Sequence, residues 1–285
     1  MEIKEFKSFF KKVGGNEGSK CHYPIRLDTY GCGCQHDCNY CYAKSLLDFR
    51  RLWDAHNPSV VNIQNMHRTI SRHLKEGDIV RLGGMTDCFQ PLEKRHRATF
   101  KTIDLLNKHN VGYLIVTKSD MVADDEYIGL MRKDLAHIQI TITCTDDRFN
   151  KTYERATPPH KRIEAVEKLQ RYGFDVQVRL SPFIPQFIKK GYLDMSIINS
   201  IECDKILVEF LRVNTWIKRW FDIDYSEYSM KQSGYLHMPL ERKIEYMKLI
   251  TGFKQVSVCE DESNAWDYWN RSLNYNKEDC CNLRR

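Results

Sequence analysis

Short runs of apolar, β-branched residues alternate along the chain with longer stretches in which apolar positions recur every three or four residues. The short runs predict six strands, at 25–30, 78–82, 111–117, 137–143, 174–180 and 205–211. The longer stretches predict helices at 42–56, 91–109, 124–135, 160–172 and 192–200. The helix at 160–172 is the clearest, because Ile163, Val166 and Leu169 share one face and a glycine follows the last turn.

This alternation predicts an α/β fold in which helical crossovers connect the strands of a parallel sheet. No GxGxxG or P-loop motif follows any of these strands, which argues against a doubly wound nucleotide-binding fold. Polar or sulfur-containing residues follow most of the strands, as in a barrel whose site lies at the C-terminal ends of its strands. They are the cysteines of 32–41, Thr86 and Asp87, Lys118, Thr143, Arg179 to Ser181, and Arg212. We therefore expect a partial, six-stranded TIM-like (βα) barrel.

The sequence changes character near residue 213, where aromatic and charged residues become frequent, as in NTWIKRWFDIDYSEYS (214–229). A helix near 240–251 and a short strand at 255–259 are predicted beyond this stretch. We expect a barrel at 1–212, including an N-terminal arm at 1–24, and a C-terminal extension at 213–285 that packs on the barrel.

Composition and charge exclude some classes of protein. No segment approaches the about eighteen uninterrupted apolar residues of a membrane span, and charges interrupt the N-terminal stretch where a secretory signal would be apolar. We therefore expect a cytoplasmic protein with reduced thiols, and the odd count of eleven cysteines also argues against a disulfide framework. The net charge of +6 permits a nucleic-acid partner without requiring one.

The stretch YGCGCQHDCNYCYAK holds four of the eleven cysteines, and Cys34, Cys38 and Cys41 have the spacing CxxxCxxC. A structural zinc site takes four ligands, so zinc would need Cys32 or His36 to complete the set. An iron–sulfur cluster on three thiolates would instead leave one iron open to another ligand. An open position favours chemistry over a purely structural role.

The three-cysteine motif, with Tyr40 before its last cysteine, resembles that of the radical S-adenosylmethionine (SAM) superfamily. Further motifs over about residues 25–212 resemble the branch that contains spore photoproduct lyase. In order, they are CQHDCNYCYAK (34–44), TDCFQPLE (86–93), TKS (117–119), TITCTDD (141–147), YERATPPHKRIEAVEKLQRYG (153–173) and RLSPFIP (179–185).

The resemblance implies a 4Fe–4S cluster on Cys34, Cys38 and Cys41, with SAM on the open iron. In this family an electron passed through the cluster cleaves SAM to methionine and a 5′-deoxyadenosyl radical, which takes a hydrogen atom from the substrate. An electron donor such as flavodoxin or ferredoxin is implied as a partner.

The resemblance also assigns residues to the cofactor. Tyr40 would lie by the adenine, Thr86 with Asp87 would contact SAM, and Lys118 would pair with the methionine carboxylate. Tyr42 would lie beside the cluster loop, with a role in the reaction. Two of these residues also have a structural interpretation: Tyr40 would pack in the core, and Lys118 would cap a helix.

Residues at later strand ends complete the predicted site. Thr141 and Thr143 are candidates for the ribose hydroxyls, or are ordinary strand residues. Arg179 and Arg212 would bind cofactor or substrate, or structural carboxylates such as Glu154 and Glu209.

The chain departs from the lyase branch at one position. Those lyases carry a hydrogen-donor cysteine at the place of Gly84 in GGMTDC, so repair of spore photoproduct is not expected. Cys88 is either a substitute donor in the reaction or a core thiol.

Three cysteines near the end of the chain raise the possibility of a second metal site. Cys259, Cys280 and Cys281 would form a zinc site or an auxiliary cluster, with Cys21 or His22. The alternative is a buried Cys259 and a mobile tail.

Three functions remain open. The first is a radical SAM enzyme acting on a DNA base or nucleotide, supported by the lyase resemblance and by aromatic residues near 216–228 that would stack on bases or cover the barrel mouth. The second is the same chemistry on a peptide, amino acid or small metabolite. The third is a non-catalytic module stabilised by metal.

Overall fold

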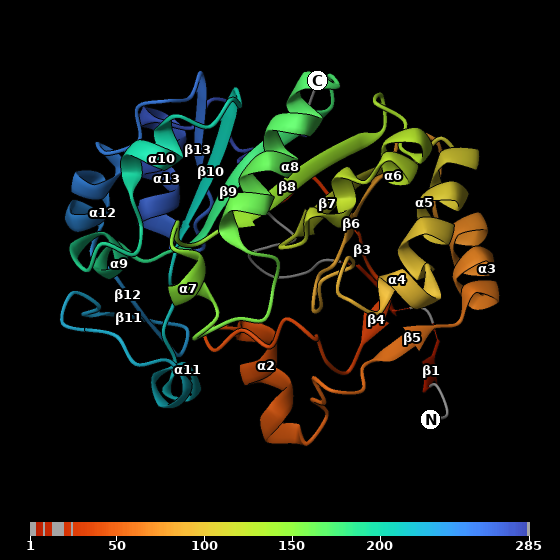
Figure 1. The fold of residues 1–285 in the computed structure, drawn as a ribbon, viewed down its shortest axis with the longest axis horizontal. Helices are drawn as coiled ribbons and strands as arrows, with labels where there is room; N and C mark the ends of the chain where they lie inside the picture. Colours follow the sequence, from red (N-terminus) through yellow and green to blue (C-terminus); the bar gives the residue numbers. More distant parts are fainter. Residues whose placement is uncertain (1–3, 8, 13–19, 24, 284–285) are drawn as a thin grey trace.

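The computed structural model describes residues 4–7, 9–12, 20–23 and 25–283. Within these residues the main sheet has eight strands in the order β13-β10-β9-β8-β7-β6-β3-β2 (Figure 1). Seven run parallel: β3 (Ile25–Asp28), β6 (Ile79–Leu82), β7 (Gly112–Thr117), β8 (Ala136–Ile142), β9 (Asp175–Phe183), β10 (Lys205–Phe210) and β13 (Gln255–Val258). The antiparallel β2 (Phe9–Lys12) forms one edge. The predicted partial TIM-like barrel and its six strands are confirmed.

Helices connect the parallel strands and cover the outer face of the sheet (Figure 1). They include α4 (Glu93–His96), α5 (Ala98–Lys108), α6 (Asp125–Leu130), α7 (Asp147–Asn150), α8 (Pro159–Arg171), α9 (Pro185–Lys189) and α10 (Met195–Asn199), with the 3-10 turn η2 (Asp120–Ala123). On β8, Ile138 and Ile140 join the apolar core that contains Val166 of α8. Because side chains alternate along a strand, Gln139 and Thr141 face the inside of the barrel.

Four predicted helices are shorter or divided, and of these α6 and α10 cover only part of the expected ranges 124–135 and 192–200. The helix expected at 42–56 is α2 (Tyr42–Leu47) followed by the 3-10 turn η1 (Asp48–Arg50), because Arg51 adopts a left-handed φ of 56°. The helix expected at 91–109 is divided into α4 and α5 at Arg97, where φ is 53°. Left-handed residues are costly in a helix, and the side-chain pattern gives no sign of them.

A small sheet beside the barrel was not predicted. It contains β1 (Glu5–Phe6), β4 (Tyr30–Gly31) and β5 (Ser59–Val61), and α3 (Ile63–His73) follows it. The apolar residues Ile63, Met66 and Ile70 of α3 have helical spacing, but only Met66 and Ile70 are fully buried. Its start is nevertheless defined by Asn62, whose side chain accepts a hydrogen bond from the backbone amide of Asn65 at 3.0 Å.

The C-terminal extension contributes a strand to the barrel. It contains α11 (Thr215–Trp220), the hairpin β11 (Met230–Gln232) and β12 (Tyr235–His237), α12 (Leu240–Met247), β13 and α13 (Ser263–Ser272). The strand β13 pairs in parallel with β10, with Lys205 opposite Gln255 and Val208 opposite Val258. The extension therefore completes the sheet as well as packing on it. Within the described residues, no helix has the length and apolarity needed to cross a membrane.

Candidate functional site

The cysteine-rich loop begins at the C-terminal end of β3 and ends at α2. The amide of Asp37 donates to the carbonyl of Cys34, and that of Cys41 donates to the carbonyl of Cys38, both at 3.1 Å. Cys41 is also the N-cap of α2, where its sulfur accepts from the amide of Lys44 at 3.5 Å. These turns place Cys34, Cys38 and Cys41 on one short path, with the first two buried and the third half-buried.

Contacts from other segments fix the backbone of this loop. The carbonyl of His36 accepts from the amide of Arg155 at 2.7 Å, and the amide of Gln35 donates to the side chain of Gln90 at 2.9 Å. At Gly33 a Cβ would lie 1.9 Å from the carbonyl oxygen of Asp54, so only glycine fits there. The loop is therefore held from three sides.

The three thiols fit a polynuclear iron–sulfur cluster. Burial, together with the charge of Asp87, raises the pKa of Cys34 to about 12, and burial also raises the pKa of Cys38 and Cys41, so these thiols lose their protons only when a cation binds. Their sulfurs do not converge within 4.8 Å, as ligands of a single ion would. In a cluster each thiolate takes its own iron, which this spacing allows.

The zinc alternative receives no support from the other candidate ligands. The Nε2 atom of His36 lies 3.2 Å from a carboxylate oxygen of Asp87, and Cys32 is exposed. Among the described residues, the one group with three ligand atoms within 4.8 Å of one another is His237, Glu260 and Asp261. Ion pairs with lysine and arginine side chains already neutralise both of its carboxylates.

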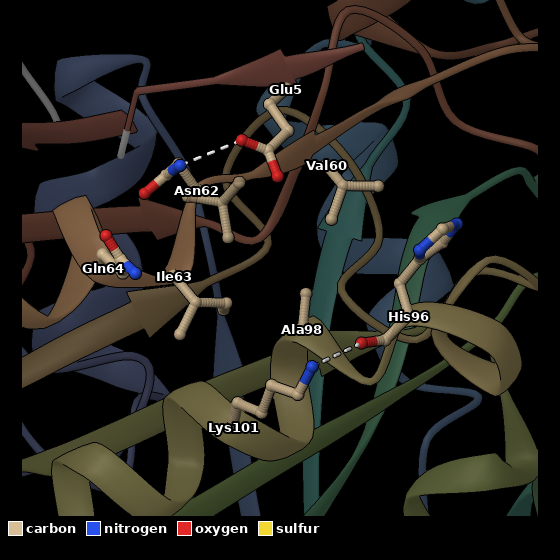
Figure 2. A pocket seen from close by; sticks show the side chains of 9 residues that line it. Glu5, Val60, Asn62, Ile63, Gln64, His96, Ala98 and Lys101 are labelled. Atoms are coloured by element: carbon tan, nitrogen blue, oxygen red, sulfur yellow. Dashed lines mark hydrogen bonds between the residues drawn. The ribbon is translucent and has the colours of Figure 1, made fainter. Parts of the chain in front are cut away.

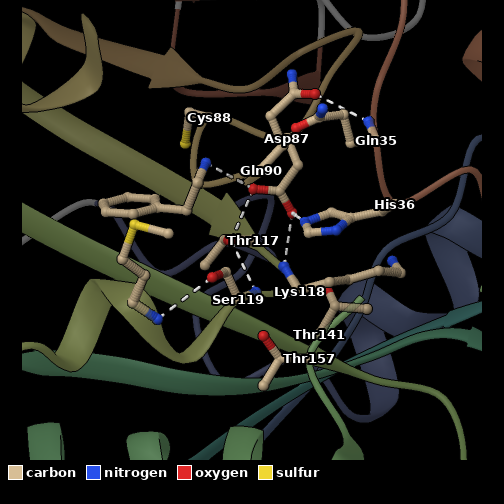
Figure 3. A network of polar contacts seen from close by, with 12 residues as sticks. Gln35, His36, Asp87, Cys88, Gln90, Thr117, Lys118, Ser119, Thr141 and Thr157 are labelled. Carbon is tan, nitrogen blue, oxygen red and sulfur yellow. Dashed lines mark hydrogen bonds and ion pairs between the residues drawn. The ribbon is translucent and has the colours of Figure 1, made fainter. Parts of the chain in front are cut away.

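Asp87 joins three loops at this end of the sheet (Figure 3). One carboxylate oxygen accepts from the Thr117 hydroxyl at 2.7 Å and from the amide of Phe89 at 2.8 Å, and the other accepts from the amide of Lys118 at 2.7 Å and faces His36. Burial would raise the pKa of Asp87, but His36 and these hydrogen bonds lower it to about 2. The predicted cofactor residue therefore serves here as the common anchor of the loops after β3, β6 and β7.

Lys118 and Tyr40 lie together beside the thiols. The Nζ atom of Lys118 is 5.5 Å from the centre of the Tyr40 ring, a cation–π distance. Within the described residues, no hydrogen bond or ion pair of this ammonium group is found. Tyr40 donates its hydroxyl to Glu154, which also binds Arg162 in a fully buried ion pair. The arrangement leaves the Lys118 ammonium available for an anionic ligand.

The loop after β6 contains two further predicted residues, Thr86 and Cys88, and is contacted by a third, Tyr42 of α2. The Thr86 hydroxyl donates to the carbonyl of Tyr30 at 2.7 Å, and the Tyr42 hydroxyl donates to the carbonyl of Gly84. Cys88 is completely buried in the large apolar core. A Cβ at Gly84 would lie 2.6 Å from Cδ of Arg26, so this side chain fills the place of the missing donor cysteine.

The predicted threonines of β8 and its following loop face the barrel interior but already have neighbours. The Thr143 hydroxyl lies 2.8 Å from that of Tyr153, and the carbonyl of Thr141 accepts from Arg162 at 3.0 Å.

The two predicted arginines share one carboxylate. Arg179 and Arg212 both bind Glu209, and Arg179 also donates to Gln139 at 2.6 Å. Burial alone would raise the pKa of Glu209, but the two guanidinium groups lower it to about 2. Of the two structural carboxylates expected for these arginines, Glu209 is confirmed, whereas Glu154 is wrong because it pairs with Arg162.

Sequence reasoning missed two buried carboxylate networks. One is the Glu154–Arg162 pair, whose members lie in a motif quoted above but meet only through the packing of α8. The other surrounds Glu93, which accepts from the hydroxyls of Tyr30 and Tyr127 and from two backbone amides at the start of α5. The only sign in the sequence that Glu93 is important is that it ends the motif TDCFQPLE, and the motif does not predict that its side chain is buried.

Two cavities lie away from the cysteine loop. One, of about 330 Å³, lies between the small sheet and α5 and is lined by residues that include Glu5, Asn62, His96 and Lys101 (Figure 2). The other, of about 550 Å³, lies at the N-terminal ends of β9 and β10. Neither is lined by a residue of the predicted site.

Comparisons with known proteins agree on the type of fold. A model of the radical SAM superfamily matches residues 29–187. An uncharacterized protein of Methanocaldococcus jannaschii is 29% identical over 164 residues, and one of Acidianus two-tailed virus is 25% identical over 168 residues. These matches cover 56% and 55% of the chain, and the chain spans 61% and 55% of the two relatives.

Solved structures are similar in fold at low sequence identity. Spore photoproduct lyase complexed with dinucleoside spore photoproduct has a TM-score of 0.62 at 14% identity, covering 87% of this chain and 78% of that one. SuiB of Streptococcus suis bound to S-adenosylmethionine has a TM-score of 0.51 at 11% identity, covering 84% of this chain and 51% of that one.

Proposed function

The chain belongs to the radical SAM superfamily, whose model matches more than half of it, and we propose that this enzyme acts on a base or nucleotide of a nucleic acid. Its cofactors are a 4Fe–4S cluster and SAM, which together supply a 5′-deoxyadenosyl radical that abstracts hydrogen from the substrate. An external reductant must deliver the electron, and we propose a flavodoxin or ferredoxin for this role.

In this proposal the residues of the site have separate tasks. Cys34, Cys38 and Cys41 hold the cluster, and the Lys118 ammonium binds the carboxylate of SAM as a charge-assisted pair. Tyr40 packs against the adenine, and Asp87 keeps the surrounding loops in place. The buried Glu154 accepts a hydrogen bond from the Tyr40 hydroxyl and so holds the ring in position.

The observation that carries the substrate class is the outer face of α11. Trp216 and Trp220 lie with ring centres 5.9 Å apart, and Arg219 lies 5.0 Å from the Trp216 ring. Lys44 of α2 lies 5.1 Å from the Trp220 ring. Aromatic rings interleaved with cations are typical of surfaces that stack bases and contact phosphates.

This face adjoins the cysteine loop. The Asn214 side chain donates to Ser45 of α2 at 3.0 Å, and α2 begins directly after Cys41. The inner face of the same segment is apolar, since Phe221 is buried against Tyr40 with ring centres 5.6 Å apart. In this proposal the inner face of the stretch covers the barrel, and its outer, aromatic and basic face contacts the nucleic acid.

Deuterium tracing tests the proposed substrate class. The reduced, reconstituted enzyme is incubated with SAM and with deuterated DNA, RNA, nucleotides, peptides or amino acids, and 5′-deoxyadenosine is analysed by mass spectrometry. We expect deuterium to arrive from a nucleic acid or nucleotide. Transfer only from a peptide, amino acid or other metabolite would establish the second function instead.

A matched pair of variants tests the α11 surface. The double variant W216A/W220A should weaken nucleic-acid binding about tenfold or more, because each stacked base contributes about 1–3 kcal/mol. The control Tyr172→Ala removes an exposed aromatic residue at the end of α8, away from α11, and should bind like wild type. Binding that does not weaken as salt increases would argue against phosphate contacts.

A further inference from the structure

Four cysteines from three distant segments lie together inside the barrel. Cys259 follows β13, Cys280 and Cys281 follow α13, and Cys21 precedes β3. All four belong to or pack against a small apolar cluster that includes Leu114 of β7, Leu207 of β10 and Trp266 of α13. We call Cys21, Cys259, Cys280 and Cys281 the second cysteine group.

Hydrogen bonds hold the last segment in place. Gln177 of β9 donates its side-chain amide to the carbonyl of Cys281 at 2.8 Å, and a ring nitrogen of His22 lies 2.8 Å from the carbonyl of Glu278. Cys280 and Cys281 are 3% and 7% exposed. The segment that carries them is therefore packed into the barrel, in contrast to the mobile tail considered from the sequence.

The segments that carry Cys21 and Cys259 meet beside this group. Lys20 donates to the carbonyl of Asp261 at 3.1 Å, and the amide of Cys259 donates to the carbonyl of Val208 at 2.8 Å. Cys280 and Cys281 belong to the same buried cluster, and Cys259 packs against it beside Cys280. Three of the four cysteines are thus neighbours.

The surroundings of the second cysteine group favour anions. The buried Arg179 lies beside the group: its guanidinium binds Glu209, and its charge also acts on Cys259 and Cys281. Thiolates on a metal cluster would be stabilised by this neighbouring cation.

The geometry also restricts the kind of metal. Cys259, Cys280 and Cys281 are not in disulfide bonds. As in the loop of Cys34, Cys38 and Cys41, no three sulfurs of the group lie within 4.8 Å of one another, so one tetrahedral zinc is disfavoured. Adjacent cysteines such as Cys280 and Cys281 can instead bind different irons of one cluster.

We propose that Cys21, Cys259, Cys280 and Cys281 bind a second iron–sulfur cluster inside the barrel, in addition to the cluster on Cys34, Cys38 and Cys41. Binding replaces the protons of the four thiols, which pass to solvent, and changes no oxidation state of the protein. The proposal is independent of the substrate of the enzyme.

Iron counting on loop variants tests it. The triple variant C34A/C38A/C41A is reconstituted anaerobically with iron and sulfide, and iron and sulfide are measured per chain together with the electron paramagnetic resonance spectrum after reduction. We expect about four irons in this variant and about eight in wild type, if each cluster has four irons. A triple variant that keeps its circular dichroism spectrum but retains no iron, or binds one zinc instead, overturns the proposal.

Variants of the second group provide the reverse test. The double variant C280S/C281S should retain about four irons, with the spectrum of the loop cluster alone. The control C144A/C203A removes two buried cysteines elsewhere and should keep about eight. If C280S/C281S keeps the iron content and spectrum of wild type, the second group binds no cluster. These readouts require neither SAM nor substrate, so they remain valid if the proposed substrate class is wrong.

Discussion

The two cysteine groups of this enzyme are built in opposite ways. Cys34, Cys38 and Cys41 lie within eight residues, on turns that hydrogen bonds close inside the loop itself. The second cysteine group is assembled from an N-terminal segment with Cys21 and a C-terminal region more than 200 residues later with Cys259, Cys280 and Cys281, which meet only when the sheet is complete. The first geometry is local and the second depends on tertiary structure.

This difference has a physical consequence for stability. Bringing distant segments together costs loop-closure entropy, which the contacts of the sheet must offset. A short loop with its own turns needs little such support, although here contacts from Asp54, Gln90 and Tyr153 add to it. We therefore expect changes in packing to affect the second group before they affect the loop.

The largest expected effect is at the loop itself. Cys38→Ala removes one of three cluster ligands and should reduce formation of 5′-deoxyadenosine from SAM to background, while iron on the second group remains. The control Cys203→Ala should make as much product as wild type. If Cys38→Ala is as active as wild type, the loop is not the site of SAM cleavage.

The next largest effect is expected at Glu154, which binds both the Tyr40 hydroxyl and Arg162. Glu154→Gln leaves the fully buried Arg162 without its carboxylate, which should lower the free energy of unfolding by about 3–5 kcal/mol. Urea unfolding measures this loss. The control Glu164→Gln changes an exposed side chain of α8, the helix that carries Arg162, and should have no measurable effect on the free energy of unfolding. A stable Glu154→Gln variant would mean that the loop does not depend on α8.

A smaller effect is expected at the predicted SAM carboxylate. Lys118→Ala should weaken SAM binding about 10- to 100-fold, because a hydrogen bond to a charged group contributes about 1.5–3 kcal/mol. Equilibrium dialysis with reconstituted protein measures the dissociation constant, and iron content should stay unchanged. Lys101→Ala, which changes a lysine beside the cavity of Figure 2, is the control. Unchanged affinity in Lys118→Ala would exclude this role.

The smallest effect lies away from the loop of Cys34, Cys38 and Cys41, at the N-terminal ends of β8 and β9. Burial would raise the pKa of Asp175, but hydrogen bonds from His137 at 2.5 Å and Lys205 at 2.6 Å lower it. A carboxylate with a lowered pKa stabilises the folded state above its unfolded pKa of about 4, and this contribution disappears as pH falls through the folded value.

Asp175→Asn should therefore cost about 1–2 kcal/mol near pH 7, and the difference from wild type should shrink as pH falls below about 4. Urea unfolding at several pH values measures it. A difference that grows at low pH would contradict the assigned sign. Neither cysteine group should change its iron content in this variant.

The sequence predicts the local site better than the assembled one. The cysteine spacing and the strand-end positions of Asp87 and Lys118 were sufficient to place these residues near one another. The pairing of Glu154 with Arg162 was not predictable, because it depends on how α8 packs against β8. Cys21 was only one of two candidate partners for the last cysteines, and the structure brings it beside them through contacts of Lys20 and His22 with the extension.

The fold shows the same limits. Strands in which isoleucines alternate with other buried residues, such as β8, were found within a few residues. The helix α3 was not predicted, although Ile63, Met66 and Ile70 have helical spacing. The strand at 255–259 was predicted as part of an extension, but its pairing with β10 required knowledge of the complete sheet. Hydrophobic patterns along the chain thus predict which residues are buried, whereas the strands or side chains that they contact are known only from the fold.

The contacts of Asp87 have a consequence for the thermodynamics of ligand binding. Because one carboxylate holds the loops after three strands through groups of the protein itself, these loops have lost most of their conformational freedom before any ligand arrives. Ordering them is then part of folding, and a ligand beside Lys118 binds without that entropic cost. Asp87→Asn should make binding of SAM more unfavourable in entropy, a change that calorimetry can resolve even where affinity changes little.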